Sequence, residues 1–507
     1  MQLIYPSANL PYKTRNCVEI SEFPLTFTSL SNMKKILSLT VLLFAAAMVF
    51  AQHATGDNTS PEEFERILKT ADRATRDFTN LPPSFTLKKY TPVPQNQDPY
   101  GTCVAWSSAY AARTISYAIK RNMTNADSIK KYAFSPGYLY YKVKAADDVN
   151  CSAGASILTA MEVMTGKGAM LKNEGLVDCA VSIAEKAELQ KAGPYKIKTF
   201  LSLVKKMDSI TKNEIIKIKK SLTEKKPVVI SMKIDDMFQT VPMSGTWSPE
   251  TDFVKIANHA MCIIGYDDKV GGGSFEVMNS WGTKWGNKGF FWLSYKQVMK
   301  YGNYAVEMMD YQPGKAEISG DIEFVKLVND SDVSLPVSRS KINTQNVVVQ
   351  GKEKAEYSLY KLAENLNSGD RFKMKFSTNA PSFIYVFAED EKPKISRLFP
   401  PNPAISAAIN SPAATYYFPS DSTHAKLDNT AGKENFCILY SKSEIDFEGL
   451  MNYIKETKVS IFQGVKDKLG PRLLDIRKVK FREDRINFQA PADDKSVLCF
   501  FVEMKHN

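Results

Sequence analysis

Hydrophobic and polar residues change their pattern along the chain and divide it into regions of different character. One unbroken apolar run spans Ile36 to Phe50. From Leu81 to Gln312, helical patterns with apolar residues three and four apart mix with strands rich in Val, Ile and Phe. After about residue 320 apolar residues alternate with a period of two, which is typical of strands with one buried face. The pattern predicts a leader, an α+β domain and an all-β domain.

The apolar run has the features of a secretory signal peptide. Two lysines precede it, and Val49 and Ala51 stand at the third and first positions before a polar sequence. A membrane anchor is the alternative, but a spanning helix needs ~20 apolar residues and this run is shorter. We therefore expect residues 33–51 to be removed next to Gln52, giving a periplasmic or secreted product with no membrane span.

The residues on either side of this leader differ from it. Residues 1–32 lack secretory features, and Met33 stands where an initiator would be, so we expect residues 1–32 to be an upstream extension of the reading frame. A genuinely long leader is the alternative. Residues 52–80 are polar and charged, with one short predicted helix over residues 61–78 whose first turn holds Pro61.

Local signals place further elements. Thr211 and Glu214 form a capping box for a helix that runs through Leu222, and a buried strand follows from Val228 to Met232. Residues 313–340 are expected to be a linker to a β domain at 341–507.

The β domain is predicted to be a sandwich with one helix near Phe447 to Lys455. Its period-two strands include residues 372–376, 383–387 and 497–502. Cys437 and Cys499 both fall on predicted strands, where a disulfide and two buried thiols are equally compatible with the sequence.

Composition narrows the chemistry. The chain has 507 residues, 66 Lys+Arg against 55 Asp+Glu, seven Cys and four His. Seven cysteines are too sparse for a disulfide scaffold and none pairs in a zinc-site spacing, so we expect no metal and no cofactor. The lysine runs have the spacing of solvated helix faces without interleaved aromatic residues, which argues against a nucleic-acid partner.

Cys103 is the first candidate for chemistry. It follows a tight loop that contains Pro99 and Gly101, and a helix with a stripe of small residues begins directly after it. The positive end of a helix dipole favours the thiolate, which is the form that attacks carbonyl carbons. A buried, inert cysteine is the alternative.

A nucleophilic cysteine needs a base and a group that orients the base. His53 lies beside the expected cleavage point, His506 is the penultimate residue and His424 lies in a polar loop, which leaves His259 at the entry of an apolar strand. Asn279 follows another strand, and its side-chain oxygen could hold the imidazole while Trp281 shields that hydrogen bond from water.

These motifs together resemble the papain family of cysteine peptidases. Gln97 stands six residues before Cys103, and His259 and the sequence Asn279-Ser-Trp-Gly follow in the family's order. The resemblance covers about 81–312 and implies a helical subdomain with the cysteine helix and a β-barrel-like subdomain with the histidine and asparagine. It implies that Cys103 is the nucleophile, His259 the base, Asn279 its orienter and Gln97 an oxyanion-hole donor.

The resemblance also implies a substrate cleft and has departures. The sequence Cys151-Ser-Ala153-Gly154 resembles the family's Cys-Asn-Gly-Gly element, so Gly154, Ala153 and Trp281 are expected to line the cleft. Tyr100 replaces a usual cysteine, so Cys151 lacks the family partner and pairs either with Cys179 or with nothing. No long charged propeptide precedes the domain, which makes zymogen inhibition doubtful, although residues 52–80 could be a short pro-segment.

The leading hypothesis is a secreted thiol protease that hydrolyses peptide bonds in peptide or protein substrates. The β domain is similar to one appended to bacterial secreted peptidases, and a cell-surface or protein ligand is its expected partner. The alternatives are an amidase or acyltransferase on the same fold and a noncatalytic surface-assembly protein that acts through the β domain. Retention of all four catalytic positions argues against the last.

Overall fold

A computed structural model describes most of the chain beyond the leader. The described residues are 53–71, 73, 76–172, 185–249, 253–310, 317–339, 346–349, 352–355, 358–390, 394–411, 414–493 and 495–507. The expected leader and cleavage point lie outside these ranges. None of the helices within them combines the length and the apolar character that a membrane crossing requires.

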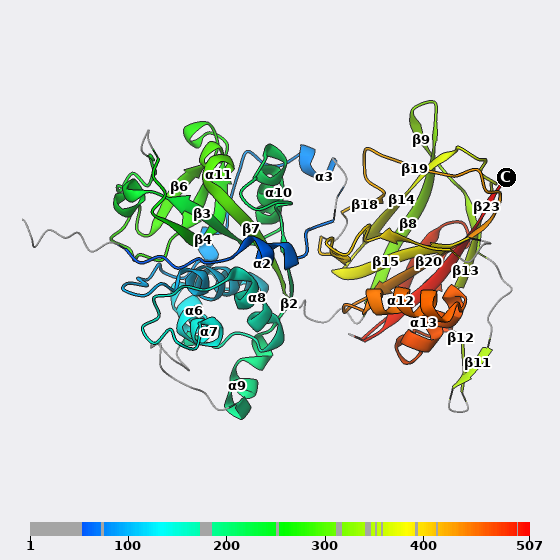
Figure 1. Cartoon of the computed structure of the whole chain (residues 1–507), viewed down its shortest axis with the longest axis horizontal. Coiled ribbons are helices and arrows are strands. Elements are labelled where there is room, and N and C mark those ends of the chain that lie inside the picture. The colour runs from blue at the N-terminus through cyan, green and yellow to red at the C-terminus, as the bar shows by residue number, and fades with distance from the viewer. Residues whose placement is uncertain are drawn as a thin grey trace, which may run out of the picture. The chain divides into compact units, whose positions relative to one another are not determined.

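The first domain has a helical part that begins at Cys103. Its first helix is continuous through three segments, with a π-helical stretch in the middle, and the predicted small side chains of Ala105, Ala109 and Ala112 are fully buried. Figure 1 shows helices α6 to α9 gathered on one side of the sheet. The helical segments are α4 (Cys103–Ala105), η2 (Trp106–Arg113), α5 (Thr114–Lys120), α6 (Ala126–Lys131), α7 (Pro136–Val143), α8 (Ile157–Gly166), α9 (Glu185–Lys191) and η4 (Gly193–Tyr195).

The second part of this domain is an antiparallel sheet in the order β2-β7-β3-β4-β5-β6, with β1 paired to β4. Its central strands are almost entirely buried, β5 at every residue and β3 at every residue except Lys233, which agrees with the apolar runs in the sequence. The strands are β1 (Ser84–Thr86), β2 (Ile197–Ser202), β3 (Val228–Ile234), β4 (Ala257–Asp267), β5 (Ser274–Met278), β6 (Phe290–Ser294) and β7 (Gly302–Asp310). The accompanying helices are α10 (Lys212–Thr223), α11 (Tyr295–Tyr301), η1 (Lys88–Tyr90), η5 (Asp236–Thr240) and η6 (Val270–Gly272).

Of two local predictions, a capping box and a helix, the first is confirmed and the second is wrong. The capping box before α10 is present, with the Thr211 hydroxyl accepting from Asn213 N and the Glu214 carboxylate accepting from Thr211 N at 3.0 Å. The helix predicted over 61–78 is wrong as one helix. It is split into α2 (Pro61–Arg66) and α3 (Arg76–Thr79), because Lys69 between them forms β-bridges instead.

The second domain contains two main sheets, in agreement with the predicted all-β character. One has the order β18-β14-β8-β22-β21, and the other β10-β13-β23-β20-β15-β16. Side chains from both sheets share one core, which includes Phe376 of the first sheet and Ile438 and Phe500 of the second. The strands are β8 (Glu317–Val328), β9 (Ser331–Ser334), β10 (Val337–Arg339), β11 (Asn346–Val349), β12 (Lys352–Ala355), β13 (Ser358–Leu362), β14 (Arg371–Thr378), β15 (Ser382–Glu389), β16 (Ile395–Phe399), β17 (Ala408–Ile409), β18 (Tyr416–Phe418), β19 (Ala425–Lys426), β20 (Gly432–Ser441), β21 (Lys480–Phe481), β22 (Ile486–Pro491) and β23 (Val497–His506).

Three features of this domain differ from the sequence expectations or decide between them. The expected linker at 313–340 holds β8, which pairs with both β14 and β22 and is therefore a structural strand of the sheet. A second helix, α13 (Ile461–Leu469), follows α12 (Phe447–Thr457), and the short turns η7 (Gly470–Arg472) and η8 (Ile476–Lys478) come after it. Cys437 and Cys499 are free, buried thiols and not a disulfide.

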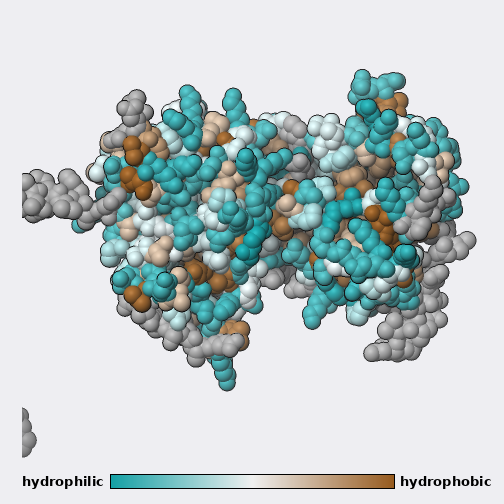
Figure 2. Space-filling view, viewed as in Figure 1, coloured by the Kyte–Doolittle hydropathy of each residue, from teal (hydrophilic) through white to brown (hydrophobic). Residues whose placement is uncertain are grey.

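The surface is predominantly polar on the face drawn in Figure 2, with hydrophobic residues in small separate patches. The most exposed large hydrophobic side chains are Met243, Val149 and Val254, at 78%, 72% and 67%. Scattered exposed hydrophobic residues of this kind are common on folded proteins and do not define a binding surface.

Candidate active site

Cys103 stands at the first position of its helix and is completely buried. Its small neighbours let α4 and η2 pack directly against strand β4. The thiol sulfur accepts a hydrogen bond from the backbone N–H of Ala260, a residue of β4, at 3.5 Å. The helix start and the strand thus meet at the sulfur.

His259 precedes Ala260 on β4 and is also completely buried. Its Nε2 lies 2.8 Å from Oδ1 of Asn279, which directly follows β5. Because Ser280 N donates to the same Oδ1 at 2.8 Å, that oxygen accepts from Nε2–H. Nδ1 is therefore the nitrogen able to take a proton, and it is buried without a hydrogen-bond partner among the described residues.

Trp281 covers the histidine–asparagine pair, as expected from the sequence. Its ring stacks on the His259 imidazole with 4.7 Å between ring centroids and 26° between planes. Trp281 is 2% exposed, so it withholds water from the Nε2–Oδ1 hydrogen bond.

Gln97 is held in a fixed orientation beside this group. Its Oε1 accepts from the Ser280 hydroxyl at 2.6 Å, and its backbone N–H donates to the Ser280 carbonyl at 2.8 Å. These contacts leave Nε2 as the donor, and it donates to the carbonyl oxygens of Ala54 and Tyr100, each at 2.9 Å. A peptide carbonyl thus already lies where an oxyanion-hole donor would hold one.

Gly154 and Ala155 present backbone groups at the same site. Gly154 has φ +84°, a conformation that favours glycine, and its N–H donates to Tyr140 Oη at 3.0 Å. Ala155 N donates to Gly56 O at 2.8 Å, and Asn58 N donates to Ala155 O at 3.2 Å. The expected cleft residue Ala153 accepts from the Asn58 side chain at 3.3 Å.

The chain that fills this cleft is the first part of the N-terminal arm, which we define as the described residues of 53–79. Ala54 accepts from Gln97 Nε2 and from Trp281 Nε1, the latter at 3.1 Å. Gly56 passes so close to Gly101 that a Cβ at Gly56 would lie 1.9 Å from the Gly101 oxygen. Only a residue without a side chain fits this position in the closed cleft.

His53 is a site residue that the sequence analysis set aside. The His53 ring stacks on the Trp281 ring, with 4.5 Å between ring centroids and 12° between planes. Nδ1 of His53 lies 2.5 Å from Oδ2 of Asp98. Position next to an expected cleavage point gave no reason to place His53 in a packed site. The signal that could have found it is Gly56, a glycine in an otherwise polar segment.

Burial controls the charge of the catalytic candidates in this closed form. Burial, aided by the Asp57 carboxylate, raises the pKa of the Cys103 thiol to about 12, despite hydrogen bonds from the N–H groups of Ala260 and Gly56. Burial lowers the pKa of His259 to about 4, although the Asn279 contact opposes this. The pair is therefore a neutral thiol and a neutral imidazole here, and the helix dipole expected to favour the thiolate is outweighed.

Comparison with known protein families matches two regions of the chain. Residues 86–312 match the papain family of cysteine proteases, and residues 365–444 match a domain of unknown function, DUF4384. Residues 86–312 are a papain-family cysteine peptidase domain. An uncharacterized peptidase C1-like protein of Acanthamoeba polyphaga mimivirus is 25% identical over 232 residues, which cover 42% of this chain and 70% of the viral protein.

Solved structures similar to part of the chain include two cysteine proteases of low sequence identity. Xylellain, a cysteine protease from Xylella fastidiosa, is 19% identical with a TM-score of 0.40, covering 51% of this chain and 98% of its own. The bromelain protease of Ananas comosus is 16% identical with a TM-score of 0.35, covering 46% of this chain and all of its own. As a cysteine-type peptidase, the domain has peptides or proteins as its substrate class.

The cysteines outside the active site complete the picture. Cys151, beside the cleft, is disulfide-bonded, and its partner lies outside the described residues. The expected pairing with Cys179 therefore stays a prediction. Cys262 on β4 is a buried free thiol.

Proposed function

We propose that the protein is a secreted thiol peptidase that cleaves peptide bonds through an acyl-thioester on Cys103. The observation that carries this proposal is the His259–Asn279 hydrogen bond, made by the strand residue directly before Ala260, whose N–H reaches the Cys103 sulfur. Nε2 is occupied by Asn279 while Nδ1 has no partner among the described residues, and the adjacent Ala260 N–H contacts Sγ. This arrangement gives a nucleophile, a base and a group that orients the base.

The proposed reaction has two halves, acylation of Cys103 and hydrolysis of the resulting thioester, and His259 transfers protons in both. The Sγ proton moves to His259 Nδ1 and the thiolate attacks the carbonyl carbon of the substrate. Gln97 Nε2 and the Cys103 backbone N–H donate to the resulting oxyanion. Nδ1–H then protonates the leaving amine as the C–N bond breaks. Water, deprotonated by Nδ1, attacks the thioester, releases the carboxylic acid and restores the thiol.

The described form is the closed, latent form of this enzyme. Asp57 and Ala155 form a parallel bridge. A substrate would place the residues before its scissile bond along Gly154–Ala155 and its scissile carbonyl oxygen at Gln97. The substrate chain would therefore run in the direction opposite to that of the arm. In the arm, Ala54 at Gln97 precedes Asp57 in sequence, so the arm fills the cleft with reversed polarity and is not presented for attack.

Hydrolysis by a chain with an opened cleft tests the proposal. We expect Gly56→Ala, which forces a Cβ against Gly101 O, to hydrolyse a fluorogenic peptide library. Adding Cys103→Ala or His259→Ala is expected to lower the rate by roughly 10⁴-fold, whereas the matched control Cys262→Ala keeps it. Products with free new amino termini identify hydrolysis and not acyl transfer. Activity that survives Cys103→Ala contradicts the proposal.

We also propose export, because the charged residues, the apolar run and the polar sequence after Ala51 follow the order of a signal peptide. N-terminal sequencing of the protein recovered outside the cytoplasm is expected to begin at Gln52. Recovery of an uncleaved chain starting at Met1 or Met33 from the cytoplasm alone would contradict it. We propose in addition that the C-terminal domain binds a cell-surface or protein ligand.

A further inference from the structure

We propose that the N-terminal arm is a single latch. Its first part, residues 53–59, closes the cleft, and its second part, the described residues of 68–73, fastens the C-terminal domain to the peptidase domain. Displacing either part then loosens the other, so that activation and release of the C-terminal domain occur together. The activation half of this inference rests on the proposed function, whereas the mechanical coupling does not.

The first part of the arm is anchored below the cleft. Asp57 is 7% exposed, and its carboxylate accepts hydrogen bonds from the hydroxyls of Ser231 and Thr59, the latter at 2.6 Å. The Thr59 hydroxyl in turn accepts from Ile157 N at 3.0 Å, at the start of α8. The cleft-filling segment therefore ends in a buried polar network of the peptidase domain.

Helix α2 joins this anchor directly to the second part. Ser60, which follows Thr59, is its N-cap, and Glu63 completes a capping box. The helix has six residues, too few to be stable without its cap and its packing. Phe64 and Ile67 are fully buried in the peptidase core. No stretch of loose chain separates the two parts.

The second part lies between the two domains as a short extended segment that forms isolated β-bridges to both. On one side, Thr70 N donates to Ser202 O at 3.0 Å, and Ser202 N donates to Leu68 O at 2.9 Å, at the end of β2. On the other side, Lys69 N donates to Ala404 O and Ser406 N donates to Lys69 O, both at 2.9 Å. Each backbone edge of this short segment is thus paired to a different domain.

Arg73 and Ala71 continue the fastening. Ala71 is 3% exposed and belongs to the hydrophobic core of the C-terminal domain. The Arg73 guanidinium donates to Glu224 of the peptidase domain at 2.8 Å and to Ser411 of the C-terminal domain at 3.0 Å. One arginine therefore binds both domains.

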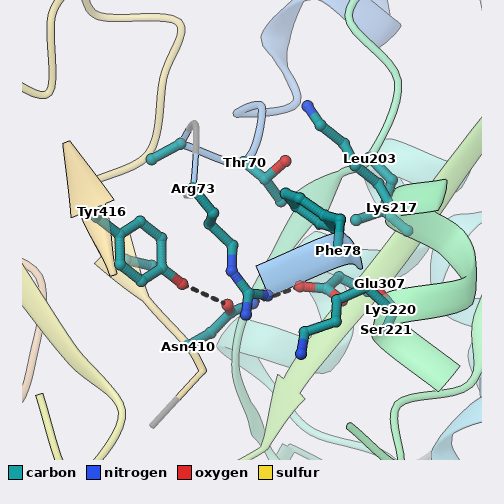
Figure 3. Close-up of a pocket in the computed structure, with 12 residues that line it drawn as sticks. Thr70, Arg73, Phe78, Leu203, Lys217, Lys220, Ser221, Glu307, Asn410 and Tyr416 are labelled. Carbon is teal, nitrogen blue, oxygen red and sulfur yellow. Dashed lines mark hydrogen bonds between the residues drawn. The ribbon is translucent and has the colours of Figure 1, made fainter. Parts of the chain in front are cut away.

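The side chains around Arg73 show that the arm completes this junction (Figure 3). Its guanidinium lies between the rings of Phe78 and Tyr416, 5.5 and 5.8 Å from their centroids. The Asn410 amide donates to Glu307, and Tyr416 Oη donates to Asn410 at 3.4 Å. These side chains leave only a small cavity of about 30 Å³, and without the arm this polar junction would open to water.

Coupling between two bound parts is reciprocal, so each end of the arm can be used to test the other. In the full-length chain, Gly56→Ala is expected to speed hydrogen exchange of the Ser202 and Ser406 amides by at least about tenfold, because both donate to the arm. Gly193→Ala is the matched control, since a Cβ there meets nothing within 4 Å.

The reverse test starts from the second part of the arm. Ala71→Asp places a charge in the core of the C-terminal domain and is expected to speed alkylation of Cys103 by iodoacetamide at least about tenfold. Thr79→Asp, at an exposed position, is the control. Arg73→Gln is the second variant in case Ala71→Asp does not fold, because it removes the guanidinium charge and keeps a polar side chain.

The outcomes separate the latch from the catalytic proposal. Faster Ser202 and Ser406 exchange in Gly56→Ala, with faster alkylation in Ala71→Asp or Arg73→Gln, supports the latch even if no peptide is hydrolysed. Unchanged exchange at Ser202 and Ser406 in a Gly56→Ala chain whose Cys103 reacts faster would overturn the latch and leave the peptidase proposal intact.

Discussion

At the scale of single residues, solvent exclusion decides the state of the Cys103–His259 pair. The thiol pKa of about 12 and the imidazole pKa of about 4 bracket a wide range in which both groups are neutral. Opening the cleft readmits water, which favours the charged forms of both groups. The arm therefore acts on the protonation of the nucleophile as well as on access to it.

The thiolate of Cys103 is expected to be absent from the closed chain between these two pKa values. Protonation of His259 becomes favourable only as the pH falls toward about 4, and ionisation of Cys103 only as it rises toward about 12. Gly56→Ala is expected to show thiolate at neutral pH. Ultraviolet difference absorbance against the matching Cys103→Ala chain measures it, and a thiolate signal at neutral pH in the closed chain contradicts this prediction.

Gln97 is expected to act on the transition state more than on substrate binding. In the Gly56→Ala background, Gln97→Ala should lower kcat by roughly 10²–10³-fold with little change in KM. Ser280→Ala removes only the hydroxyl that orients Gln97 and should cause a smaller loss. A kcat unchanged in Gln97→Ala would exclude an oxyanion-hole role.

Residue types and spacing alone selected His259 and Asn279, and the structure brings these two side chains into hydrogen-bond contact. Four histidines and one strand-entry position were enough to select His259, and the sequence Asn279-Ser-Trp-Gly supplied its neighbours. His53 could not be selected in the same way, because its stacking on Trp281 joins residues 228 positions apart. No local pattern reports such a contact.

At the scale of elements, predictions held where a local signal fixes a boundary. The Thr211 cap and the following strand are both present, since a capping box and Pro227, which ends the helical stretch before the strand, act within a few residues. The helix predicted to continue after α2 is wrong, because Lys69 forms bridges to Ser202 and Ile405. This tertiary pairing overrides the helical pattern of the segment. Strand β8 lies in the segment expected to be a linker, because it too is fixed by tertiary pairing, here with β14 and β22.

The cap of α10 offers a test at this scale. Thr211→Ala removes the hydroxyl that accepts from the helix and weakens the hold on the buried Glu214 carboxylate. We expect a loss of about 1 kcal/mol in the free energy of unfolding. Asn213→Ala, at an exposed neighbouring position, is the control for urea unfolding. Equal stability of both variants would contradict the role of the cap.

At the scale of the whole molecule, the two domains share a buried charged junction. Burial alone would raise the pKa of Glu224, but Lys226 and Arg73 outweigh it and hold this pKa at about 2. Ser411 of the C-terminal domain donates to the same carboxylate. Sequence patterns predicted both domains but not this junction, because its partners come from three distant segments.

Acid is expected to weaken the junction. A carboxylate whose folded pKa is depressed adds stability that is complete above its ordinary pKa of 4.5 and is lost as the pH falls toward about 2. The contribution is roughly 3 kcal/mol. Unfolding midpoints measured through this pH range should fall less steeply in Glu224→Gln than in the unsubstituted chain. Parallel pH dependences would contradict the assignment.

Trapping the acyl-enzyme tests the role of Cys103 most directly. The full-length Gly56→Ala chain is mixed with blocked dipeptide nitrophenyl esters, quenched in acid during turnover, digested and analysed by mass spectrometry. The expected result is one acyl group on the peptide that contains Cys103, and none in the Cys103→Ala chain. Turnover with no acyl group on Cys103, and at the same rate in Cys103→Ala, would contradict the thiol peptidase assignment.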